Sequence, residues 1–176
     1  FQKYACLAYS TDGVNWTVFN GYQGWLPVIN TDTFNGLRSV AYSPQLGLWM
    51  AIGSKYGMAT STDGMNWSGY RISPLSRFSP VVDKVVWHAG TNKFIAGSGD
   101  NIIAYNSNGL ATGWVFKNLL PTGGVSNANA GITVWPSTTS STILATSSFD
   151  RIWRSTDGVN WTLVVGDGTF QDEPVR

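Results

Sequence analysis

The sequence predicts an all-β fold of small four-stranded sheets that follow one another along the chain, and three observations support this. A seven-residue box, Ser-Thr-Asp-Gly-x-Asn-Trp, occurs three times in 176 residues. Short strand-like runs recur at fixed distances before the boxes. Charged residues make up only 12% of the chain, so uncharged polar residues must form much of the surface. Because internal repeats of ~40–50 residues are typical of propellers and solenoids, we expect a β-propeller.

The three intact boxes begin at Ser10, Ser61 and Ser155. Their Asp residues are separated by 51 and then 94 residues, which leaves room for an altered copy midway. The segment Asn106-Ser107-Asn108-Gly109, followed by Trp114, fills that place and makes the successive gaps 51, 45 and 49. The predicted box residues are Ser10, Asp12, Gly13, Trp16, Ser61, Asp63, Gly64, Trp67, Asn108, Gly109, Trp114, Ser155, Asp157, Gly158 and Trp161.

Strand-like runs keep a constant register with the last three boxes. An Ala (Ala51, Ala96 or Ala145) lies 12 residues before the box Asp or Asn, and nine or ten residues earlier another run ends in an aromatic residue. The repeated unit is therefore four short strands, with the box between the third and fourth. The predicted strands lie at 37–43, 47–53, 57–61 and 66–72, then 84–88, 92–97, 101–106 and 113–118, then 130–135, 141–147, 151–155 and 160–165.

The chain opens inside a unit. Counting 12 residues back from Asp12 lands just before Phe1, so the first unit should contain only its third and fourth strands, at 4–9 and 15–19. Open sheet edges favour pairing with another segment, so more chain or other subunits of an assembly should complete the propeller. We expect a single propeller segment: a half blade at 1–20, blades at 37–72, 84–118 and 130–165, and a polar tail or start of closure at 166–176.

The residue types of the box suit a tight chain reversal. Gly tolerates positive φ, and a short Asp side chain accepts hydrogen bonds from turn amides. The Trp can bury a large ring while its N–H reaches a carbonyl. Since one motif repeated four times cannot be one active site, we expect all four boxes to be structural.

These boxes resemble the Asp-box, or BNR repeat, of sialidases and many other propellers. The usual family pattern is S-x-D-x-G-x-x-W, whereas this chain has S-x-D-G-x-N-W, which is one residue shorter. The shorter form is similar to repeats of phage tail and bacterial secreted propellers. The resemblance covers nearly the whole chain and implies a sialidase-like fold, but this fold hosts many unrelated activities.

Composition excludes several classes of partner and cofactor. A net charge of +1 without a basic cluster argues against nucleic acid or an anionic membrane as partner. A single cysteine and a single histidine leave no cluster for zinc or a redox metal, and we expect no cofactor. No apolar run approaches the ~18 residues of a membrane span, so membrane insertion is not expected.

Catalysis is the less favoured interpretation. For a sialidase-like enzyme, the resemblance implies three arginines that hold a carboxylate, a Tyr–Glu pair and an Asp acid/base. The chain has six arginines, but its only glutamate, Glu173, lies in the polar tail. His88 could act as a base with Asp83 or Asp100, although a lone His is more often a turn or surface residue. Cys6 lies on an apolar strand and should be an inert core thiol, so we expect no catalytic residue.

The edge opposite the boxes is the expected binding face. In four-stranded blades the 1–2 and 3–4 turns share one edge, which leaves the long connections at about 20–36, 73–83 and 119–129 on the other. Aromatic residues among Asn, Ser and Thr there suit carbohydrate stacking or a protein interface. Inter-blade packing is the favoured interpretation for Trp25 and Phe34, and among the tryptophans only Trp25 is a candidate for an exposed platform. The candidate face residues are Tyr22, Trp25, Lys55, Tyr56, Arg77, Phe78, Asp100 and Asp150.

Two classes of function remain open. The favoured one is a noncatalytic propeller module of an extracellular or virion assembly, such as a phage tail or fibre, that contacts host-surface glycan or neighbouring subunits. The second is a sialidase-like glycoside hydrolase with part of its site on additional chain. A lectin-like, carbohydrate-binding propeller lies between them.

Overall fold

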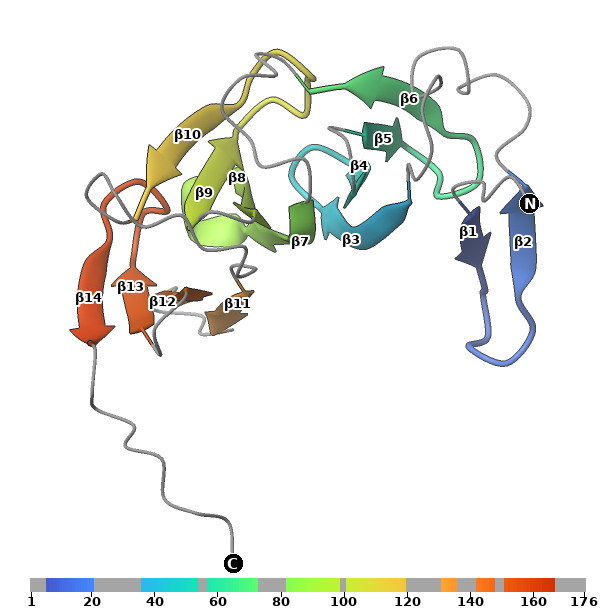
Figure 1. The fold of residues 1–176 in the computed structure, drawn as a ribbon. Coiled ribbons are helices and arrows are strands. Elements are labelled where there is room, and N and C mark those ends of the chain that lie inside the picture. The colour runs from blue at the N-terminus through green and yellow to red at the C-terminus, as the bar shows by residue number, and fades with distance from the viewer. Residues whose placement is uncertain are drawn as a thin grey trace, which may run out of the picture.

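The computed structural model describes residues 6–20, 36–53, 57–72, 82–98, 101–119, 131–135, 142–147 and 151–166. Within them the chain forms one two-stranded and three four-stranded antiparallel sheets, which follow one another along an arc (Figure 1). We call these sheets the first to fourth blades in chain order. The secondary structure of these residues is β-strand apart from one 3-10 turn at Ala89–Thr91.

In each blade the spatial order of the strands is their order along the chain. The strands are β1 (Cys6–Tyr9) and β2 (Thr17–Asn20) in the first blade; β3 (Leu37–Ser43), β4 (Leu48–Gly53), β5 (Gly57–Ser61) and β6 (Ser68–Arg71) in the second; β7 (Val82–His88), β8 (Lys93–Ser98), β9 (Ile102–Asn106) and β10 (Val115–Asn118) in the third; and β11 (Ile132–Trp135), β12 (Thr142–Ser147), β13 (Arg151–Ser155) and β14 (Thr162–Val165) in the fourth.

The three four-stranded blades share one pairing register, centred on an Ala of the second strand. Ala51 pairs with Val40 on one side and Ala59 on the other, and Ala96 and Ala145 are flanked in the same way. Because a one-residue slip would turn every side chain to the other face, this register fixes which residues each blade buries. The equivalent residues beside the Ala are Val40, Val85 and Ile132 on the first strand and Ala59, Ala104 and Trp153 on the third.

The aromatic residue of the fourth blade pairs differently from those of the second and third blades. Tyr42 pairs with Trp49 and Trp87 pairs with Phe94, two residues before the Ala in each case. In the fourth blade Val134 takes this position, and Trp135 pairs one step further on, with Thr142. The connection between its first two strands is two residues longer than in the second and third blades, and the aromatic residue lies outside the shared register.

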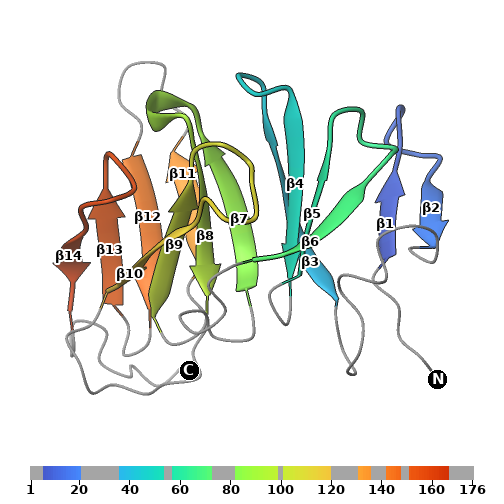
Figure 2. The same cartoon turned by 90° about the horizontal axis from the view of Figure 1, so that it is seen from above.

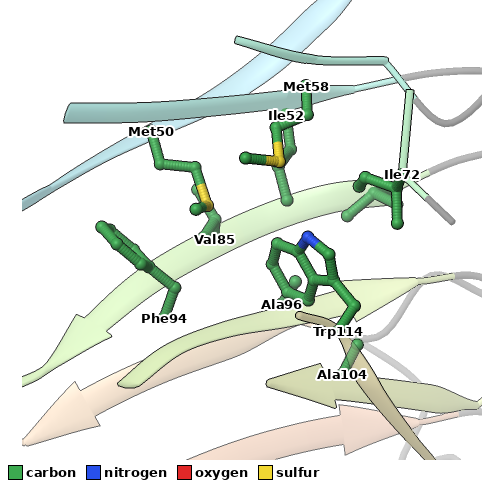
Figure 3. Packing of buried hydrophobic residues seen from close by; sticks show 10 residues of the cluster. Met50, Ile52, Met58, Ile72, Val85, Phe94, Ala96, Ala104 and Trp114 are labelled. Atoms are coloured by element: carbon green, nitrogen blue, oxygen red, sulfur yellow. The ribbon is translucent and has the colours of Figure 1, made fainter. Parts of the chain in front are cut away.

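Neighbouring blades pack face to face. Between the second and third blades a buried cluster joins Met50, Ile52 and Met58 to Val85 and to other residues of the third blade (Figure 3). A second cluster joins Ile95 and Ile103 of the third blade to the fourth. Burial of one such aliphatic side chain stabilises a fold by roughly 1.5–3 kcal/mol, so these two interfaces hold the blades together. The third-blade residues labelled in Figure 3 are Val85, Phe94, Ala96, Ala104 and Trp114.

Polar contacts also link the second and third blades through their innermost strands. The Ser39 hydroxyl accepts a 3.1 Å hydrogen bond from the Val85 amide. The Trp87 indole N–H donates to Gln45 Oε1 at 2.8 Å, at the turn edge of the same two strands. β3 and β7 also contact each other, and these contacts fix the position of the third blade relative to the second.

Candidate functional site

The boxes close their hairpins through hydrogen bonds within the turn. In the second box, Asp63 Oδ1 accepts bonds from the Met65 amide at 2.8 Å and the Asn66 amide at 2.6 Å, and Oδ2 accepts one from the Asn66 side chain at 2.7 Å. The Ser61 hydroxyl donates to Asp63 Oδ1 and accepts from the Gly64 amide. The first and fourth boxes repeat this set around Asp12 and Asp157.

These hydrogen bonds stabilise the charged form of each carboxylate. The pKa of Asp63 lies well below its ordinary value, chiefly because of the Asn66 amide, followed by the Asn66 side chain and the Met65 amide. The pKa of Asp12 is lowered by the same set of donors. In Asp157 the Asn160 amide again has the largest effect, partly opposed by burial. All three carboxylates are therefore ionised, and their oxygens bond to the turn itself.

The glycine and tryptophan of the box have distinct tasks. Gly13, Gly64 and Gly158 adopt φ between 71° and 75°, a region that side chains rarely enter. The indole N–H groups of Trp67 and Trp161 donate to the carbonyls of Gly64 and Gly158, at 3.0 and 3.3 Å.

The first box departs from the expected burial. Trp16 is 62% exposed, so the prediction that only Trp25 among the tryptophans could be exposed is wrong. In the second and fourth blades the box Trp packs at an inter-blade cluster, Trp67 beside Leu7 and Trp161 beside the cluster of Ile95. The part of the chain that the structure describes begins with the first blade, so it has no preceding blade to cover Trp16.

The third box keeps the turn with different residues. Asn106 replaces the Ser: its Oδ1 accepts bonds from the Asn108 amide at 3.1 Å and the Gly109 amide at 2.7 Å. Asn108 replaces the Asp and accepts the Leu110 amide at 2.9 Å. Sequence reasoning missed the role of Asn106, although its position two residues before Asn108 matches that of the box Ser. Trp114 is 4% exposed and lies in the core between the second and third blades (Figure 3).

All box hairpins lie at one edge of the molecule. In Figure 2 the four box hairpins, β1–β2, β5–β6, β9–β10 and β13–β14, lie on the upper side, as do the β3–β4 and β7–β8 turns. The second strand of each four-stranded blade therefore ends, and its third begins, at the opposite edge, as at Gly53 and Gly57 in the second blade. This arrangement separates the boxes from the connections that we expect to bind a ligand.

Comparison with known proteins rests on structure. A scan against models of protein families and a search of curated proteins find no match. A solved structure described as "YCF48 bound to D1 peptide", which is a β-propeller, matches with a TM-score of 0.51 over 86% of this chain at 15% sequence identity. The chain spans 43% of that structure's chain, which is less than half its length.

This chain has a β-propeller fold. The predicted fold class, with four-stranded antiparallel blades and a box hairpin between the third and fourth strands, is thereby confirmed. At 15% identity the similarity concerns the fold alone. The Asp-box resemblance and the functions it implies stay predictions.

The predicted binding face of the propeller lies outside the described residues. This applies to all eight candidates: Tyr22, Trp25, Lys55, Tyr56, Arg77, Phe78, Asp100 and Asp150. The structure does describe residues that flank some of them. Asn101, next to Asp100, is buried with φ 59°, and its carbonyl accepts the Leu119 amide at 3.0 Å. The start of β9 and the end of β10 are thus tied together at this edge of the third blade.

His88 does not pair with Asp83, the less favoured of the two roles considered for it. His88 is fully buried at the end of β7, where its Nδ1 lies 2.7 Å from Thr91 Oγ1. Asp83 lies five residues away along the same strand, or about 17 Å at the usual rise per residue. We also expected His88 to be a turn or surface residue. It lies directly before the 3-10 turn, but its side chain is fully buried, so the surface part of this expectation is wrong. Asp100 lies outside the described residues.

Asp83 instead forms an ion pair between blades. Arg38 Nη1 lies 2.6 Å from Asp83 Oδ1, and the two side chains are 47% and 18% exposed. Arg38 and Asp83 lie near the starts of β3 and β7, at the edge opposite the boxes. Because exposed ion pairs contribute at most about 1 kcal/mol, this pair orients the two inner strands more than it stabilises them.

The other groups weighed for catalysis are widely separated or undescribed. Arg151 and Arg154 lie on β13, two blades away from Arg38. Glu173 lies outside the described residues, as does the side chain of Cys6. In the described ranges no group of three or more His, Cys, Asp or Glu side chains could hold a metal ion. No helix in those ranges is long and apolar enough to cross a membrane.

Proposed function

We propose that the chain is a noncatalytic propeller module of an extracellular or virion assembly, similar to a phage tail or fibre component. It binds host-surface glycan or neighbouring subunits through the connections opposite the boxes. The observation that carries the proposal is the hydrogen bonding of the box carboxylates: Asp12, Asp63 and Asp157 each accept bonds within their own turn. A carboxylate used in this way builds a scaffold.

The scaffold supports binding at the opposite edge. The box hairpins lie at one edge, while the connections between successive blades leave from the other. Loops held by a rigid framework are where proteins commonly place binding residues. Trp25 belongs to the connection between the first two blades, and Tyr56 belongs to the short loop between β4 and β5 at the same edge. Their ring faces suit stacking against sugars or a protein surface.

A protein segment is the second candidate ligand. The similar structure holds a peptide, the D1 peptide, on a propeller. Blades that present loops of mixed aromatic and polar residues also suit a wet protein interface. A neighbouring subunit of an assembly would supply such a segment.

A glycan array probed with the labelled intact protein tests the favoured proposal. We expect selective binding that falls about tenfold or more in Trp25→Ala and Tyr56→Ala, since stacking aromatics dominate such sites. Trp16→Ala is the matched control, because Trp16 is 62% exposed and lies in the first box, at the edge opposite these connections. No binding to any glycan, or equal loss in all three variants, would contradict the glycan proposal.

Hydrolysis of a fluorogenic sialoside separates the enzyme from the binding module. We expect no turnover above background, because Glu173 is the one glutamate that could form the Tyr–Glu pair of sialidase chemistry. Turnover that disappears in Glu173→Gln would overturn the noncatalytic proposal and favour a hydrolase.

A further inference from the structure

The third box carries an Asn-Gly pair at an exposed turn between β9 and β10. Asn108 is exposed and directly precedes Gly109, whose φ is 74°. Asn is among the chemically labile residues of proteins. When glycine follows, no Cβ obstructs the approach of its backbone nitrogen to the Asn side-chain carbon. The pair therefore has the composition of a deamidation site.

Deamidation at this pair needs only water and a base from the solvent. The Gly109 amide nitrogen loses its proton and bonds to Asn108 Cγ, while the Cγ–Nδ2 bond breaks and the side-chain nitrogen takes up a proton and leaves as ammonia. Water then opens the succinimide ring that has formed. Cleavage of the new Cγ–N bond gives aspartate, and cleavage of the original peptide bond gives isoaspartate. Either product has a carboxylate in place of an amide, so the third box gains a negative charge.

The hydrogen bonds of the turn restrain the attacking nitrogen. The Gly109 amide donates to Asn106 Oδ1 at 2.7 Å, and this bond is buried. The same oxygen accepts the Asn108 amide at 3.1 Å, and Asn106 Nδ2 donates to the Leu110 carbonyl at 2.7 Å. A buried amide proton that is held by an acceptor becomes accessible to a base only when the local structure opens. Asn106 therefore controls the step in which the Gly109 amide loses its proton.

A second contact in the turn favours the reaction. The Leu110 amide donates to Asn108 Oδ1 at 2.9 Å, and negative charge develops on this oxygen when Cγ is attacked. Because Asn108 is exposed, water can supply a similar donor, so the contact should raise the rate only roughly two- to tenfold. Opening of the turn around Asn106 instead breaks three hydrogen bonds. The restraint by Asn106 therefore outweighs the assistance by Leu110.

We propose that Asn108 is a deamidation site, and that the buried Asn106 sets its rate by holding the Gly109 amide proton. The reaction proceeds through local opening of the turn between β9 and β10. This opening breaks the bonds of Asn106 but leaves the blades folded. The third box thus contains both the reactive pair and the side chain that restrains it.

The aspartate product fits the turn. In the second box Asp63 Oδ1 accepts the Met65 amide at 2.8 Å, and Asn108 Oδ1 accepts the Leu110 amide in the same way. Deamidation to aspartate therefore gives the third box the Asp-Gly pair of the other three. It also adds a charge at the edge where the box hairpins lie (Figure 2). Isoaspartate instead lengthens the main chain by a methylene group before Gly109, which would move the Gly109 amide away from its acceptor.

Peptide mapping by mass spectrometry tests the proposal on the whole chain. The parent and Asn106→Ala are incubated for weeks at mildly alkaline pH, and the proteolytic peptide that contains Asn108 is followed for replacement of its amide by a carboxylate. We expect slow conversion of the parent and at least about tenfold faster conversion of Asn106→Ala, because three hydrogen bonds no longer restrain the turn. Hydrogen exchange of the Gly109 amide, measured by NMR, should accelerate by a similar factor, because both processes begin with the same opening.

Asn106→Ser is the matched control at the same position. A Ser there keeps an acceptor for the Gly109 amide, as Ser61 accepts the Gly64 amide at 2.9 Å in the second box. Asn106→Ser should therefore convert at least about threefold more slowly than Asn106→Ala. This comparison isolates the acceptor from the other changes that Ala introduces.

References elsewhere in the chain separate opening of this turn from general destabilisation. Ser61→Ala weakens the second box and should leave the rate at Asn108 within about twofold of that in the parent. The sequence also contains the pairs Asn20-Gly21 and Asn35-Gly36, whose rates should be the same in Asn106→Ala and in the parent. Circular dichroism of each variant checks that its strands are formed.

Three outcomes would overturn the proposal. An Asn108 that stays unchanged in both the parent and Asn106→Ala would show that the pair is no deamidation site. Equal rates in these two chains would show that Asn106 does not control the reaction. Equal acceleration of all three Asn-Gly pairs in Asn106→Ala would show that the variant acts by unfolding the whole chain. Glycan binding is measured separately and at the opposite edge, so its failure and that of this proposal are distinguishable.

Discussion

The second and third boxes make the same turn with different chemistry. In the second, a hydroxyl and a carboxylate, those of Ser61 and Asp63, accept the turn amides. In the third, the amide oxygens of Asn106 and Asn108 take both positions. The glycine has nearly the same φ in each, 73° at Gly64 and 74° at Gly109.

The comparison shows that the turn needs acceptors at two fixed points more than it needs a negative charge. An Asn side chain is longer than a Ser side chain, and Asn106 uses the extra length to donate from Nδ2 to the Leu110 carbonyl at 2.7 Å. The third turn is also two residues longer than the others, and its extra residues follow Leu110, where the Gly113 amide donates to the Leu110 carbonyl at 3.2 Å. Burial also differs, since Asn106 is 0% exposed and Asp63 is an exposed residue.

The largest expected effect comes from Asn106→Ala. The substitution removes two acceptor bonds and one donor bond and leaves the buried Gly109 amide without a partner, which should lower the free energy of unfolding by about 2–4 kcal/mol. Ser61→Ala should cost about 1–2 kcal/mol, because its turn keeps the Asp63 bonds. Urea denaturation measures both, with Ser107→Ala as an exposed control. If Asn106→Ala lowered the free energy of unfolding no more than Ser61→Ala, the buried Asn106 would not matter more to its turn than Ser61 does.

The glycines of the second and third boxes, Gly64 and Gly109, differ in the space around them. Substitution of Gly64 or Gly109 by Ala places a side chain at positive φ, which should lower the free energy of unfolding by about 1–2 kcal/mol. At Gly64 the added Cβ has no neighbour nearer than Trp49 Nε1 at 3.5 Å, but at Gly109 it overlaps Leu48 Cδ2 of the second blade. Gly109→Ala should therefore cost about 1 kcal/mol more than Gly64→Ala. Equal costs, measured by thermal unfolding, would mean that Leu48 moves aside freely.

Much of this turn chemistry could be read from the sequence, and its burial could not. The Asp-Gly spacing predicted the hairpins because Gly and Asp have local reasons to form them. The exposure of Trp16 depends on what lies across an inter-blade space, and local pattern carries no information about that. The burial of His88 likewise follows from packing around the end of β7, where a lone His gave no signal.

The loss of folding stability at acid pH should depend on the three intact boxes and not on the third box of the chain, which has no carboxylate. The pKa values of Asp12, Asp63 and Asp157 are lowered in the folded chain, so their contribution is fully present above the ordinary Asp pKa of about 3.9. It is lost as pH falls below that value toward the lower folded pKa.

Asp63→Asn tests this dependence. The variant should lose less stability than the parent between neutral pH and the acid range, whereas Asn108→Gln should leave the pH profile unchanged. Thermal unfolding from pH 7 to pH 3 gives both profiles. If the stability of Asp63→Asn and of the parent fell in parallel with pH, the box carboxylates would not cause the loss of stability at acid pH.

The smallest expected effect belongs to Asn108→Asp, which restores the charge of an intact box. Asn108 is exposed and accepts the Leu110 amide, but Ala111 stands where the other boxes have an Asn whose side chain and amide both donate. An Asp here would gain few donors, so stability at neutral pH should change by less than about 0.5 kcal/mol. Its pKa, measured by NMR titration, should stay nearer the ordinary value than that of Asp63. A pKa as low as that of Asp63 would mean that the backbone of this turn alone creates the carboxylate site.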